Sequence, residues 1–72
     1  MDKELLRVIG ENVKKYREKA NLTQAELAEK IGIGTASVSR IERGEKRMKL
    51  ETLRAFADAL DISVGLLFYQ EN

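Results

Sequence analysis

Residues 22–45 read LTQAELAEKIGIGTASVSRIERGE, and this stretch decides the fold of the chain. Thr23 is followed three positions later by Glu26, which is the pattern of a capping box at the start of a helix. Apolar residues then step by three and four, and the pattern resumes after an interruption at Gly32. The stretch therefore predicts two short helices joined by a tight turn, at residues 24–31 and about 35–43.

Two short helices joined by a turn that contains glycine match the helix-turn-helix unit, placed here at about residues 23–43. Val38 and Ile41 would hold the second helix from behind. Its outward side then carries small or polar residues, as a helix entering a major groove of ~12 Å requires. These outward residues are Thr35, Ala36, Ser39 and Arg40. A plain helical hairpin within a bundle has the same pattern, so the residues alone leave both readings open.

Helical periodicity also covers the flanking segments, and no strand candidate is found. An apolar stripe predicts a first helix over about residues 3–20, with Gly10 inside it, which is tolerable where another helix packs closely. Asn21 is expected to end this helix in a left-handed turn. A fourth helix over about residues 50–60 carries Leu50, Leu53, Phe56, Ala57 and Leu60 inward, and Ser63 would cap a short fifth helix. We expect a single, compact, all-α domain of five helices over residues 1–72.

Composition excludes several classes of function. The chain has 72 residues with 13 basic and 12 acidic side chains, and it contains neither Cys nor His. Thiolate metal sites and the usual proton shuttle at neutral pH are therefore missing. No nucleophile–base spacing or phosphate-binding loop is found, so we expect no enzyme, no cofactor, no metal and no small-molecule ligand. We also expect no membrane span and no signal peptide, hence a cytoplasmic protein.

The net charge of +1 is the sum over segments of the chain that differ in the sign of their charge. Residues 13–19 hold four basic side chains and one acidic one, and residues 40–54 hold six and three. Residues 55–72 contain no basic side chain and three acidic ones. The pattern favours a basic face and an acidic end, although solvated helix faces would be the ordinary explanation.

Residues 9–68 resemble the Cro/XRE-type helix-turn-helix family, which includes lambdoid phage repressors and restriction–modification controller proteins. The resemblance rests on the opening LTQ-x-x-LA, the segment G-I-x-x-x-x-x-S-x-I-E-R-G and the ending L-E-T-L…A-x-A-L…S-x-x-x-LF. Gly34 departs from the family, because Ser or Thr usually caps the second helix of the unit at this position. The resemblance implies a lambda-repressor-like DNA-binding domain.

The resemblance also implies roles for individual residues. The base-reading positions would be Thr35, Ala36, Ser37, Ser39 and Arg40, and the phosphate-binding positions Thr23, Gln24, Arg43, Lys46 and Arg47. The side chain of Gln24 would brace the second helix of the unit. Arg17 and Glu42 resemble a partly buried structural ion pair, with a phosphate contact by Arg17 as the alternative.

Relatives of this kind read palindromic operators as two-fold dimers, with half-sites ~34 Å apart. The expected homodimer interface lies at the C-terminal end, about residues 61–72, and consists of Val64, Leu66, Phe68 and Tyr69. Alternatively, Val64 and Leu66 cover the core of the monomer. Leu67 and Phe68 are also expected to be core residues by the same resemblance.

We therefore predict a sequence-specific, double-stranded-DNA-binding transcriptional regulator, either a stand-alone controller or a small phage-type repressor. It would act at the bacterial nucleoid or in a phage-infected cell. The alternative is an antitoxin-like interaction module that neutralises a partner protein and binds DNA secondarily.

Overall fold

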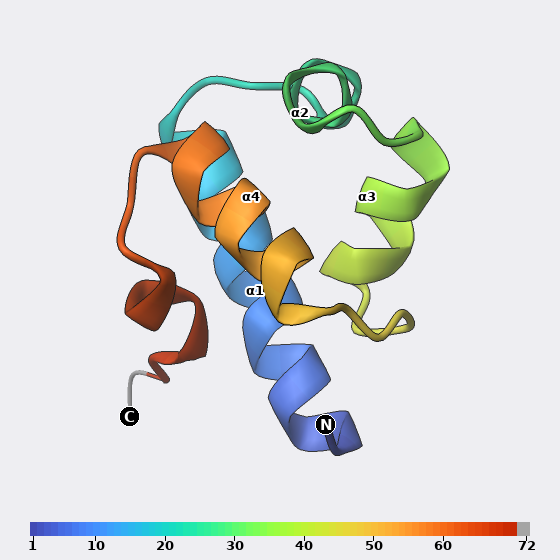
Figure 1. Cartoon of the computed structure of the whole chain (residues 1–72), viewed down its shortest axis with the longest axis vertical. Coiled ribbons are helices and arrows are strands. Elements are labelled where there is room, and N and C mark those ends of the chain that lie inside the picture. The colour runs from blue at the N-terminus through green and yellow to red at the C-terminus, as the bar shows by residue number, and fades with distance from the viewer. Residues whose placement is uncertain (71–72) are drawn as a thin grey trace.

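The computed structural model describes residues 1–70, and all regular secondary structure in this part of the chain is helical (Figure 1). Its four α-helices and one 3-10 helix are α1 Lys3–Lys19, α2 Gln24–Ile31, α3 Thr35–Glu42, α4 Leu50–Leu60 and η1 Val64–Phe68. The all-α prediction is confirmed. The predicted C-terminal end at 61–72 extends two residues beyond the described part of the chain.

The prediction of a fifth α-helix is wrong. Residues 64–68 form a single stretch of 3-10 helix, and the side chain of Ser63 makes no capping hydrogen bond to it. Five residues are too few to repay the cost of nucleating an α-helix, and Gly65 in their middle lowers helix propensity further. The tighter 3-10 turn fits this short segment.

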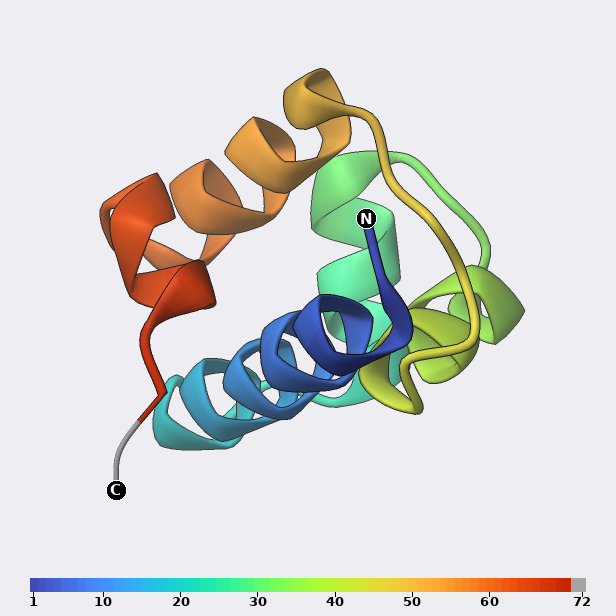
Figure 2. The same ribbon diagram turned by 90° about the horizontal axis from the view of Figure 1, so that it is seen from below.

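The core lies where α1, α2, α3, α4 and η1 meet. Its largest fully buried side chains are Phe56, Ile9, Leu27, Ile41, Leu53, Leu67, Val13 and Val38. The prediction that Leu50 faces inward is wrong, because this first residue of α4 is 71% exposed. The helix-turn-helix unit, α2 and α3, lies on one side of α1, and η1 lies on the opposite side (Figures 1 and 2). Since α1 contacts both α3 and η1, it connects the two sides of the domain.

All four α-helices end in the same way, with one residue in the left-handed conformation. These residues are Asn21, Gly32, Gly44 and Asp61, with φ of 58°, 87°, 73° and 57°. After each, the next amide donates to the carbonyl five residues back, as in Leu22 to Arg17 and Ile62 to Ala57. This six-to-one bond is typical of the Schellman motif. The left-handed turn predicted at Asn21 is confirmed, whereas the one at Asp61 was not predicted.

Gly10 sets the distance between α1 and the end of α3. A Cβ atom at this position would lie 2.4 Å from the carbonyl oxygen of Ile41 and 2.7 Å from that of Glu42. Such distances are far shorter than van der Waals contact, so only glycine allows the two backbones to meet here. The close packing of another helix against Gly10 is confirmed.

Candidate nucleic-acid interface

The helix-turn-helix unit begins at a complete capping box. The Thr23 hydroxyl accepts from the amide of Glu26 at 3.0 Å, and the Glu26 carboxylate accepts from the amide of Thr23 at 2.8 Å. The hydrogen bonds from the Thr23 amide and hydroxyl hold the pKa of Glu26 below its ordinary value. The first amides of α2 have no partner within the helix and carry its positive dipole end. Thr23 and Gln24 lie at this end.

A network of three polar side chains joins α1, α2 and α3. Arg17 donates through Nε to Glu42 Oε2 at 2.6 Å and through a second nitrogen to Oε1 at 3.1 Å. Gln24 donates to the same Glu42 Oε1 at 2.9 Å. Arg17 also donates to the carbonyl of Leu22, at the turn after α1. The network thereby fixes the start of α2 relative to the end of α3.

The ion pair in this network is largely removed from solvent, with 12% of the Arg17 side chain and 4% of the Glu42 side chain exposed. The hydrogen bond to Glu42 raises the pKa of Arg17 above its ordinary value, although burial acts in the opposite direction. In this arrangement the guanidinium of Arg17 is turned into the protein and toward α3.

The outward side of α3 is small and polar. Val38 and Ile41 are buried behind the helix. Of the predicted base-reading residues, Thr35, Ala36 and Arg40 are exposed, while Ser37 and Ser39 are half-buried. Gly34 makes no side-chain cap at the start of the helix. The structure therefore brings the five residues together along one short helix, with three of them open to a ligand.

Arg43, just after α3, is held by two neighbours. It donates to the Ser39 hydroxyl at 2.5 Å, and its Nε lies 3.2 Å from Glu45 Oε2. Lys46 is half-buried and Arg47 exposed in the loop that follows. Sequence reasoning missed the pairing of Arg43 with Glu45, because both residues follow the end of α3 at Glu42 and helical spacing rules do not apply there.

The predicted interface residues at the C-terminal end divide into two groups. Val64 packs against the core, as in the alternative reading, and Leu67 is fully buried. Leu66, Phe68 and Tyr69 are 37%, 37% and 59% exposed. The prediction that Phe68 is a core residue is wrong. A 3-10 helix has three residues per turn, so residues 64 and 67 share the inward side and residue 68 faces outward.

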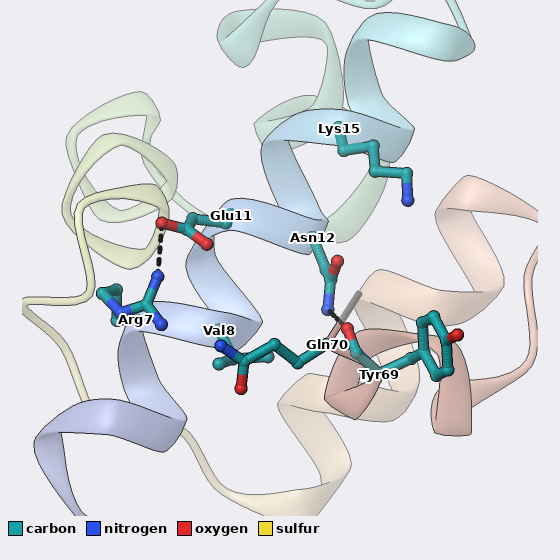
Figure 3. Close-up of a pocket in the computed structure, with 7 residues that line it drawn as sticks. All are labelled: Arg7, Val8, Glu11, Asn12, Lys15, Tyr69 and Gln70. Atoms are coloured by element: carbon teal, nitrogen blue, oxygen red, sulfur yellow. Dashed lines mark hydrogen bonds and ion pairs between the residues drawn. The ribbon is translucent and has the colours of Figure 1, made fainter. Parts of the chain in front are cut away.

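Sequence reasoning also missed Asn12, which is buried in α1 and 8% exposed. Its side-chain nitrogen donates to the carbonyls of Leu67 and Tyr69, both at 2.8 Å. Figure 3 shows the Asn12 side chain pointing from α1 toward the backbone of Tyr69. A signal was present, because Asn12 lies three residues after Ile9 on the apolar stripe.

None of the helices in residues 1–70 combines the length and the apolar character needed to span a membrane. The same residues contain no cluster of three or more carboxylate, thiol or imidazole side chains that could hold a metal ion.

A helix-turn-helix unit with a polar outward helix, basic residues beside it and a rigid support behind it defines a DNA-binding transcriptional regulator. The helix-turn-helix family model matches residues 13–67. The chain belongs to this family.

Individual relatives agree with this class. The control protein C.SmaI of Serratia marcescens is 37% identical over 65 residues, which cover 90% of this chain and 77% of that protein. The crystal structure of the restriction–modification controller protein C.AhdI from Aeromonas hydrophila is similar, with a TM-score of 0.84 and 32% identity. The match covers 88% of this chain and 96% of that one.

The biofilm regulator SinR, solved in complex with DNA, matches with a TM-score of 0.79 and 34% identity, over 85% of this chain and 98% of that one. The chain spans only 44% and 53% of the length of two phage repressors that it matches. These relatives are named as regulators and repressors, not as enzymes.

Proposed function

We propose that this chain binds operator half-sites in palindromic double-stranded DNA as a homodimer, with α3 in the major groove. It would serve as a stand-alone restriction–modification controller or a small phage-type repressor. The observation that carries the proposal is the exposed polar side of α3, held in place by the Arg17–Glu42–Gln24 network. Regulators of this kind act on DNA in the cytoplasm, at the bacterial nucleoid or in a phage-infected cell.

In this proposal the outward residues of α3 read base edges. Arg40 is exposed and long enough to donate to O6 and N7 of guanine, a contact worth ~1–3 kcal/mol of discrimination. The methyl group of Ala36 suits a thymine methyl, and the hydroxyl of Thr35 can donate or accept. Ser37 and Ser39 flank these residues, and Ser39 keeps a hydroxyl proton to donate because its oxygen already accepts from Arg43.

The phosphate contacts come from the two ends of the unit. At the start of α2, the backbone amide of Gln24 would bind a phosphate oxygen at the positive helix end, next to Thr23. After α3, Arg43, Lys46 and Arg47 would bind the backbone that borders the groove. Such contacts fix the position of the protein on DNA without carrying sequence information.

The homodimer would form through the exposed apolar side chains Leu66, Phe68 and Tyr69. They lie within four consecutive residues, and an apolar surface of this kind on so small a domain favours a protein partner. The segment lies on the side of α1 away from α3 (Figure 2). Because the chain has no basic side chain after Arg54, this end is not attracted to phosphates.

The operator would first be isolated by selecting genomic fragments that the protein retains. Arg40→Ala should then relax the preference at one base position, whereas Lys46→Ala should weaken all sequences alike and reduce the salt slope by ~1. Lys30→Ala, an exposed change on α2, is the matched control for the loss of one positive charge. If Arg40→Ala weakens selected and unrelated DNA by the same factor, Arg40 does not read a base.

The dimer is tested by sedimentation. Leu66→Glu should shift the protein to monomers, because it places a carboxylate in the middle of the apolar surface. Thr52→Glu, on a half-buried polar position of α4, should leave the mass unchanged. If the Leu66→Glu protein still sediments with the mass of a dimer, Leu66 is not part of the interface.

A further inference from the structure

Among residues 1–70, Asn12 is the only polar residue that is buried when backbone and side chain are taken together, with 8% of the residue exposed. Burying an amide is costly unless its hydrogen bonds are made. Asn12 makes both bonds that its nitrogen can donate, to Leu67 O and Tyr69 O at 2.8 Å each. The two acceptors lie 55 and 57 residues further along the chain. One side chain of α1 therefore holds the backbone of the C-terminal segment at two points.

The rest of the segment is weakly held. Leu67 anchors it through its fully buried side chain. The 3-10 helix has no side-chain cap, and its closing bond, from the Tyr69 amide to the Leu66 carbonyl, is long at 3.4 Å. Leu67 and the half-buried Val64 hold the segment through apolar contacts, which are non-directional and therefore set its depth more than its rotation. The two directional bonds from Asn12 supply that orientation.

The orientation decides what the segment presents. The carbonyls bound by Asn12 belong to residues 67 and 69, and the exposed side chains belong to Leu66, Phe68 and Tyr69. In Figure 3 the ring of Tyr69 points away from Asn12, while its carbonyl points toward it. Holding these carbonyls against α1 therefore turns the neighbouring side chains to the outside.

We propose that Asn12 is a positioning residue for assembly: its amide orders residues 66–69 so that Leu66, Phe68 and Tyr69 are presented to a second copy of this chain. The inference rests on the homodimer proposed above. An apolar residue at position 12 would serve the helix and the core at least as well, since Asn has a low helix propensity. What only the amide provides is the pair of bonds to the segment.

The test compares Asn12→Leu and Asn12→Ala with Lys14→Ala, an exposed change on the same helix. Leu keeps the branched shape of the side chain but replaces the whole amide by apolar groups, so it removes both N–H donors and the acceptor oxygen. The dimer dissociation constant is measured by sedimentation at a temperature where every variant is fully helical. We expect both Asn12 variants to weaken the dimer about ten-fold, the effect of losing two hydrogen bonds, and Lys14→Ala to leave it unchanged.

A second measurement separates positioning from general stability. Hydrogen exchange should become faster at the amides of Leu66 and Tyr69 in Asn12→Leu, with α1, α2 and α3 protected as before. Affinity for a duplex that carries one half-site should stay the same, because α3 is not displaced.

Three results would overturn the proposal. If a folded Asn12→Leu protein has an unchanged dimer dissociation constant, the homodimer stands but Asn12 has no part in its assembly. If Asn12→Leu loses helicity and half-site affinity in parallel, Asn12 only stabilises the fold and does not position the segment for assembly. If the unmodified protein stays monomeric at high concentration, the homodimer itself fails, and the role of Asn12 fails with it.

Discussion

Arg17 Nε and Glu42 Oε2 lie 2.6 Å apart although their residues are separated by 25 positions. The contact joins the last turn of α1 to the last residue of α3, and Gln24 adds the first residue of α2 to the same carboxylate. The position of α3 relative to α1 and α2 therefore depends on one largely buried carboxylate.

Glu42→Ala should lower the free energy of unfolding by about 3–5 kcal/mol, because it leaves the guanidinium of Arg17 without its partner. Urea denaturation followed by circular dichroism measures the change. Glu45→Ala breaks an ion pair that is about half exposed and should cost less than about 1 kcal/mol. Equal losses in the two variants would mean that burial of the Arg17–Glu42 pair adds nothing.

Gly10→Ala should destabilise the protein although alanine favours helices. The gain in propensity is about 1 kcal/mol, but the new methyl group would lie 2.4 Å from the Ile41 carbonyl oxygen. Overpacking typically costs about 1–3 kcal/mol, and here the clash is with the backbone of both Ile41 and Glu42. Gly65→Ala is the control, because a Cβ there meets nothing within 4 Å. A more stable Gly10→Ala protein would refute the close approach.

Asp61→Gly should stabilise the protein by about 0.5–1 kcal/mol. Asp61 ends α4 in the left-handed conformation, which glycine adopts without steric cost. Asp58→Gly, inside the same helix, should instead cost roughly 0.5 kcal/mol, because glycine is the poorer helix former and the exposed ion pair with Arg54 is lost. Thermal unfolding of the two variants should therefore shift in opposite directions, and a shift in the same direction would contradict the prediction.

Glu45→Gln should strengthen DNA binding. The Glu45 carboxylate lies 3.2 Å from Arg43, and a phosphate would have to compete with it for the guanidinium. Freeing Arg43 should raise the affinity for unrelated duplex DNA about two- to five-fold and steepen the salt slope by about one. Glu29→Gln changes the net charge equally at an exposed position on α2. If it produces the same gain, net charge alone explains the effect.

Acid should weaken the start of α2 through Glu26. Its pKa in the folded protein lies below the ordinary value of 4.5, because the amide and hydroxyl of Thr23 stabilise the carboxylate. This contribution to stability is therefore present above pH 4.5 and is lost as the pH falls through the folded pKa. The stability difference between the unmodified protein and Glu26→Gln should shrink on acidification. The difference for Glu29→Gln serves as the reference, and a constant Glu26 difference would contradict the assignment.

The parts of the fold that the sequence predicted are those with local causes. Thr23 and Glu26 form the capping box that their spacing indicates, and Asn21 takes the left-handed turn that its side chain tolerates. The four α-helices follow from apolar residues at steps of three and four. In each case the signal and the structure lie within a few residues of each other.

The features that the sequence did not predict depend on contacts between distant segments. The 3-10 helix forms because Leu67 and Val64 dock on α1 and α4, which no periodicity within five residues can indicate. Asn12 could be identified as a polar residue on an apolar stripe, but its two acceptors are backbone atoms that leave no trace in residue types. The charge pair of Arg43 and Glu45 is the exception: its residues are neighbours in sequence, but both follow the end of α3, where helical spacing rules do not apply.

Gly10 and Asn12 lie two residues apart on α1, and they contact opposite sides of the domain. The backbone at Gly10 lies against the end of α3, and the side chain of Asn12 holds the segment that follows α4. Within a two-fold dimer built on that segment, less than one turn of α1 would separate the subunit contact from the reading helix. The distance between the two α3 helices of the dimer would then be fixed by this short, rigid part of α1. Such a protein would tolerate very little variation in operator spacing, so inserting one base pair between half-sites should abolish paired binding.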